Sequence, residues 1–115
     1  MLTLTNNIIV SHNIGISLWN YTNTAVADYT LFYGNTLADT TLVVTSTHAI
    51  TGLDPLFLNP ASGNYHLRFG SPAIDAGIPI PWLTWDIDGD RRPPCANYDI
   101  GADEARFLLL PIILR

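Results

Sequence analysis

Three aspartates at alternate positions are the residues of this 115-residue chain whose type and spacing most directly suggest chemistry. Asp86, Asp88 and Asp90 stand in the short segment Asp-Ile-Asp-Gly-Asp. Carboxylates gathered by a tight turn could supply the oxygen ligands of a Ca²⁺ ion. The segment does not fit an EF-hand loop, because Arg91 and Asn97 occupy the places of the required glycine and glutamate. The alternative is that the aspartates cap turns and pair with arginine.

A second acidic cluster follows, made of Asp99, Asp103 and Glu104. Two carboxylates held about 5–10 Å apart could hydrolyse a glycosidic bond. Nothing in the sequence fixes such a distance, and Gly101 with its neighbouring alanine indicates tight packing. We therefore expect one of these carboxylates to hold Arg92 and so to tie the last loop to the body of the fold.

Aromatic residues offer a different chemistry, because exposed rings can stack on the faces of sugars. Trp82 and Trp85 lie in a proline-rich segment, and Tyr33 lies in the first half of the chain. These three residues are candidates for carbohydrate binding. For the two tryptophans, however, we expect that they plug the open end of the coil rather than bind a ligand.

The remaining reactive residues predict no catalytic site. The histidines are His12, His48 and His66, and their separations match no metal-ligand spacing. Cys95 is the single cysteine, so no intrachain disulfide can form. No catalytic residue is predicted.

Composition and charge exclude some partners. The net charge is −5, only 13% of the residues are charged and lysine is absent, so nucleic acid is a poor partner. The apolar run 107–114 contains a proline and is too short to span a bilayer. No signal peptide precedes the first strand-like segment, so either the protein stays in the cytoplasm or the chain begins partway through a longer secreted protein. We expect the second.

The first half of the chain contains a repeat of short strands. Residues 6–12 align with residues 29–35 at an offset of 23, with Ile8 on Leu31. Short strands separated by Asn and Gly at such a period are typical of a solenoid of stacked β coils. No segment has the periodicity of an amphipathic helix. Two hairpins of a β-sandwich remain the alternative.

The second half is a series of tight turns. Glycine, proline and Asp or Asn interrupt residues 54–77 every few positions, and residues 64–68 alternate like a half-buried strand. We therefore divide the chain into coils over residues 1–53, a turn-rich closing module over 54–104 and an apolar tail over 105–115.

Four segments of the second half resemble successive signatures of one family. They closely resemble the end of right-handed parallel β-helix proteins of the choice-of-anchor type, which are bacterial secreted or surface proteins of the pectate-lyase-like superfamily. The four segments are Gly52–Leu67, Gly70–Gly77, Asp86–Pro93 and Asp99–Glu104.

The resemblance implies an all-β right-handed parallel β-helix whose last coils are followed by the closing module. It further implies a structural, non-catalytic end piece at the cell surface or outside the cell, with upstream coils of a parent chain as its partner. The alternatives are a fragment of a polysaccharide lyase or glycoside hydrolase with its active site upstream, or a surface that binds polysaccharide or another component of the cell envelope.

Overall fold

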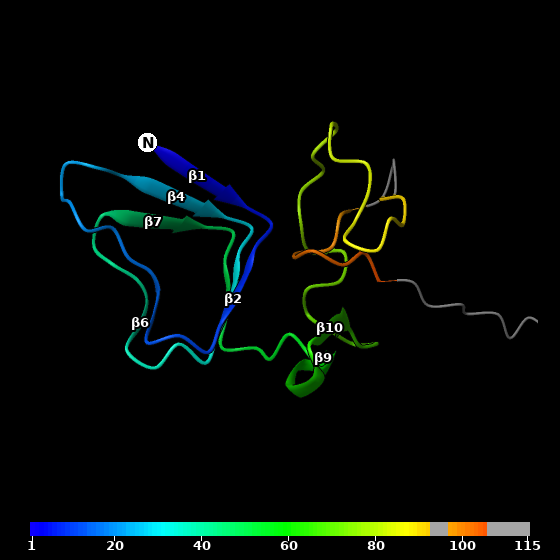
Figure 1. Ribbon diagram of the computed structural model, residues 1–115. Coiled ribbons are helices and arrows are strands. Elements are labelled where there is room, and N and C mark those ends of the chain that lie inside the picture. The colour runs from blue at the N-terminus through cyan, green and yellow to red at the C-terminus, as the bar shows by residue number, and fades with distance from the viewer. Residues whose placement is uncertain (93–96, 106–115) are drawn as a thin grey trace, which may run out of the picture.

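The computed structural model describes residues 1–92 and 97–105 (Figure 1). The predictions for Cys95 and for the apolar residues 107–115 lie outside these ranges. Within them the chain is all-β, with one 3₁₀ turn at Pro60–Ser62 and no α-helix. The strands are β1 (Leu2–Thr5), β2 (Ile8–Val10), β3 (Ile14–Ile16), β4 (Ala25–Asp28), β5 (Leu31–Tyr33), β6 (Ala38–Thr40), β7 (Val44–Thr47), β8 (Ile50–Thr51), β9 (Phe57–Asn59) and β10 (Asn64–Leu67).

The first half of the chain passes through three parallel sheets in a fixed order. The sheets have the strand orders β1-β4-β7, β2-β5-β8 and β3-β6. Each passage adds one strand beside the previous one, so the strands stack as successive coils (Figure 1). This parallel pairing is compatible with a β-helix-like fold, and it rules out the hairpin alternative for residues 1–53, because hairpin strands are antiparallel.

The register of the sheets confirms the repeat read from the sequence. Ile8 pairs with Leu31, an offset of 31 − 8 = 23 residues. The next coil contains fewer residues, since Leu31 pairs with Ile50 at an offset of 50 − 31 = 19 residues. At the corner before the second sheet, each coil has one residue in the left-handed backbone conformation. The φ values are 58° at Asn6, 49° at Tyr29 and 47° at His48. The rings of Tyr29 and His48 stack with centroids 4.5 Å apart.

Alternation along the strands of the second sheet divides their side chains between two apolar clusters. Phe32 points into the coils and packs with Ala25, Ala27 and Val44 from the first sheet. Because successive strand residues face opposite sides, Leu31 points out of the coils. The short side chains at Ala25 and Ala27 leave room inside the coil for the ring of Phe32.

The closing module packs on the outer face of the second sheet. Leu31 is completely buried there against Leu67, Ala73 and Ile100 of the module. Ile50 of the last coil joins the same cluster. Figure 1 accordingly shows the module beside the coils, next to β2, rather than over the end of the stack.

A buried polar contact fixes the module against the first coil. The side-chain amide of Asn6 accepts a hydrogen bond from the N–H of Ile78 at 2.9 Å and donates one to its carbonyl at 2.7 Å. The main chain must come very close for this contact. A Cβ at Gly77 would lie 2.8 Å from Oδ1 of Asn6 and 2.8 Å from the carbonyl oxygen of Tyr98, so only glycine fits without displacement.

Candidate functional site

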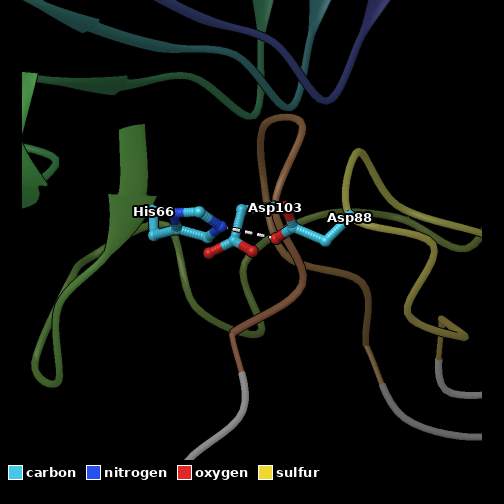
Figure 2. A group of neighbouring side chains, drawn as sticks. All are labelled: His66, Asp88 and Asp103. Atoms are coloured by element: carbon cyan, nitrogen blue, oxygen red, sulfur yellow. Dashed lines mark hydrogen bonds and ion pairs between the residues drawn. The ribbon is translucent and has the colours of Figure 1, made fainter. Parts of the chain in front are cut away.

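Three segments of the closing module bring one histidine and two aspartates together (Figure 2). His66 comes from β10, Asp88 from the loop after Trp85, and Asp103 from the last described segment. Nε2 of His66 lies 2.5 Å from Oδ2 of Asp88. Each of the three residues offers one nitrogen or oxygen atom that could bind a metal, and these three atoms lie within 4.8 Å of one another. The side chains of His66 and Asp88 are 43% and 39% exposed, whereas Asp103 is buried. The group is therefore open to solvent on one side.

A neighbouring asparagine orients the imidazole. Nδ1 of His66 lies 2.5 Å from Oδ1 of Asn64, and the same oxygen accepts the backbone N–H of His66 at 3.1 Å. Since the backbone N–H can only donate, the atom that receives it is the amide oxygen, and Nδ1 must carry a proton to bond with it. Nε2 therefore faces the carboxylates. The hydrogen bond with Asp88 raises the pKa of His66, with added influence from Asp103 and Asp86.

Asp103 is positioned by the backbone of β10. Its Oδ2 accepts the N–H of Leu67 at 3.0 Å. Burial raises the pKa of Asp103, and the hydrogen bond from Leu67 lowers it in part. A buried carboxylate of this kind favours a cation beside it.

The three aspartates singled out in the sequence also lie close together. Asp86, Asp88 and Asp90 each offer a carboxylate oxygen within 4.8 Å of the others. Oδ1 of Asp86, however, accepts the N–H groups of Asp88 at 2.9 Å and Asp90 at 2.8 Å, and its Oδ2 accepts the N–H of Glu104 at 2.9 Å. Burial raises the pKa of Asp86, but these three hydrogen bonds outweigh it and lower the pKa overall. Asp86 thus caps the loop, as the structural alternative predicted, and Ca²⁺ binding stays a prediction.

The second acidic cluster confirms the expected partner of Arg92. Nη1 of Arg92 lies 2.8 Å from Oε2 of Glu104, and both side chains are almost fully buried. Asp99 has a different role, since its two oxygens accept the N–H groups of Asp75 at 2.8 Å and Ala105 at 2.6 Å. Burial, followed by the charge of Asp99, raises the pKa of Glu104 to about 7, despite the opposing effect of Arg92. These carboxylates therefore hold the turns of the module together.

A cleft of about 720 Å³ separates the first coil from the closing module. Its walls are mainly apolar, with Ile8 and Val10 on the side of β2 and Ile80, Leu83 and Ile87 on the opposite side. Arg92 lines the same cleft, and its Nε is the buried side-chain atom in residues 1–92 and 97–105 that has no hydrogen-bond partner. The volume is within the usual range for ligand pockets.

The three aromatic candidates are exposed to solvent to different degrees. Trp82 is 81% exposed, Trp85 58% and Tyr33 37%. The expectation that the two tryptophans plug an end of the fold is therefore wrong. Their loop belongs to a module that covers the side of the coils, so both rings remain in solvent and available for stacking.

Sequence reasoning missed the group of His66, Asp88 and Asp103. The three histidines were judged by their separations from one another, whereas His66 meets carboxylates that lie 22 and 37 residues further along the chain. The alternation in residues 64–68 placed Tyr65 and Leu67 on one face and thus His66 on the other. That pattern was the available signal, although it did not indicate a partner.

Comparison with protein-family models, with curated proteins and with solved structures gave no match for this chain. In the part of the chain that the structure describes, no helix is long and apolar enough to cross a membrane.

Proposed function

We propose that this chain is the structural C-terminal end of a secreted or cell-surface protein built as a right-handed parallel β-helix. In this proposal further coils of the parent chain stack on β1, β2 and β3, and the closing module holds the last coils together from the side. The observation that carries the proposal is that these three strands each form the edge of their sheet on the same side of the stack.

The edge strands retain hydrogen-bonding groups for another coil. The N–H groups of Leu2 and Asn6 bond to the carbonyls of Thr24 and Asp28. Since the backbone alternates, the N–H and C=O of Thr3 point away from β4. Three such edges on one side of a stack are a template for strand addition, which a further coil satisfies.

The outer face of the first coil is also less covered than that of the second. Leu31 on β5 is fully buried, whereas Ile8 on β2 is half-buried and faces the cleft. A strand added beside β2 would extend this sheet, and its outward-facing side chains would contact the closing module across the cleft. The apolar lining of the cleft supports this role.

Adding one coil tests the proposal. A second copy of residues 2–24 is inserted between Met1 and Leu2, which preserves the 23-residue offset that pairs Leu2 with Ala25. The added strand should pair with β1, so the amide of Thr3 should exchange more slowly with solvent and the melting temperature should rise. Both are measured, by hydrogen exchange with NMR detection and by circular dichroism.

The matched control inserts the same residues in scrambled order. If the duplicated and scrambled insertions leave the Thr3 amide equally unprotected, the first coil does not accept another, and the proposed role as the end of a longer stack is lost.

The exposed tryptophans favour carbohydrate binding as a second candidate function. Trp82 and Trp85 present large, solvent-exposed rings on one loop. Titration with soluble polysaccharides should then change the tryptophan fluorescence, and Trp82→Ala should abolish the change. Trp19, which is 99% exposed on the coils, provides the control substitution. An equal loss with Trp19→Ala would remove the case for this loop.

A further inference from the structure

We propose that Nε2 of His66 and the carboxylates of Asp88 and Asp103 form a binding site for a first-row divalent metal ion such as Zn²⁺ (Figure 2). This inference is independent of the proposed stacking of further coils, because all three residues belong to the closing module.

The donor atoms suit such an ion. One imidazole nitrogen and two carboxylate oxygens are ligands that Zn²⁺ accepts at about 2.0–2.2 Å. The three atoms lie within 4.8 Å of one another, so small side-chain rotations bring them around one ion. The imidazole favours a first-row transition metal over Ca²⁺, which takes oxygen ligands.

The imidazole is already oriented for a metal at Nε2, and binding would release the proton that Nε2 donates to Asp88. Its Nδ1–H is directed at Oδ1 of Asn64, and this leaves Nε2 facing Asp88 and Asp103. Ligating histidines in proteins usually donate their second N–H to such an acceptor, which fixes the tautomer and the ring direction. Asp103 has equivalent support from the N–H of Leu67.

The local charge also favours a cation. Asp86 adds a further carboxylate close to Asp88. Arg92, four residues after Asp88, forms its ion pair with Glu104. A divalent ion would balance the carboxylates of Asp88 and Asp103.

A metal at this position would join three segments that are distant in sequence. His66 lies on β10, Asp88 on the loop after Trp85 and Asp103 on the last described segment. With three protein ligands and an exposed side, the ion would keep one position for water. A module without an intrachain disulfide would gain a cross-link.

The test uses the full chain, freed of metal with EDTA and titrated with ZnCl₂ or CaCl₂ in a non-coordinating buffer. Calorimetry should show one Zn²⁺ per chain, and the melting temperature should rise with Zn²⁺ concentration. The ¹⁵N chemical shift of Nε2 in His66 should change on Zn²⁺ addition, while Nδ1 stays protonated.

Three substitutions separate this site from the neighbouring aspartates. His66→Gln and Asp88→Asn should each lower the affinity for Zn²⁺ by more than tenfold, and Asn64→Ala should lower it by about 10- to 100-fold through the lost support of the ring. Asp90→Asn, in the same loop, is the matched control and should leave Zn²⁺ binding unchanged.

Circular dichroism of each variant checks that it is folded. Zn²⁺ binding that survives His66→Gln would overturn the proposal, as would a wild-type chain whose Nε2 signal and melting temperature do not respond to Zn²⁺. A response to Ca²⁺ alone, lost in Asp90→Asn, would assign the ion to Asp86, Asp88 and Asp90 instead.

Discussion

Arg92 and Glu104 form a buried ion pair, with Nη1 2.8 Å from Oε2 and the two side chains 5% and 6% exposed. Arg92 also donates to the carbonyl of Gly101 at 3.2 Å and lies over the ring of Tyr98, with Cζ 5.5 Å from its centroid. The segment before residue 93 is thereby fixed to the end of the described chain.

Arg92→Ala should lower the free energy of unfolding by about 3–5 kcal/mol, because it leaves the Glu104 carboxylate buried without its partner. Urea denaturation measures the effect. Arg91→Ala is the control, since Arg91 is exposed and its change should stay within about 0.5 kcal/mol. Equal stability of the two variants would show that the pair does not hold the module.

Asn6→Ala should cost about 2–3 kcal/mol. The substitution removes both hydrogen bonds to Ile78 and places alanine at a φ of 58°. Asn7→Ala removes only a local bond to the carbonyl of Thr5 and should cost less than about 1 kcal/mol. The same denaturation experiment compares them, and a larger effect at Asn7 would contradict the assigned role of Asn6.

Leu31→Ala should destabilise the chain by about 2–5 kcal/mol, because it opens a cavity between the coils and the module. Leu37 is 69% exposed, so Leu37→Ala is the matched control with an expected change below about 0.5 kcal/mol. Proteolysis should also cut the Leu31 variant faster within the module. A cleavage rate like that of the wild type would mean that the module does not depend on this contact.

Acid should weaken the contact between Asp28 and His48 at the coil corner. Oδ1 of Asp28 lies 2.8 Å from Nδ1 of His48, and this hydrogen bond is the main cause that lowers the pKa of Asp28 below its ordinary value of 3.8. The Asp28 carboxylate therefore binds a proton more weakly in the folded chain than in the unfolded chain. The stabilisation is therefore fully present above pH 3.8 and is lost as the pH falls through the lower folded pKa.

Melting temperatures of the wild type and Asp28→Asn measured between pH 6 and pH 2 check this. The wild type should be more stable at pH 6, and the difference should shrink in acid. A difference that stays constant over the range would mean that the Asp28 carboxylate does not stabilise the fold through its charge.

Local patterns in the sequence predicted the strands and their pairing in the coils. The alignment of Ile8 with Leu31 predicted the register directly, because stacked coils repeat their strand and corner positions along the chain. The sequence also predicted that a carboxylate of the acidic cluster after residue 98 binds Arg92, whereas the structure decided that this carboxylate is Glu104.

Only the tertiary structure decided where the closing module lies and which side chains it gathers. The sequence shows that Leu31 is apolar but not that its cover is Leu67, Ala73 and Ile100. The group of His66, Asp88 and Asp103 likewise depends on three turns whose directions no local pattern specifies. Periodicity encodes contacts between neighbouring repeats, whereas packing between distant, non-repeating segments is set by the shapes of both surfaces once they have folded.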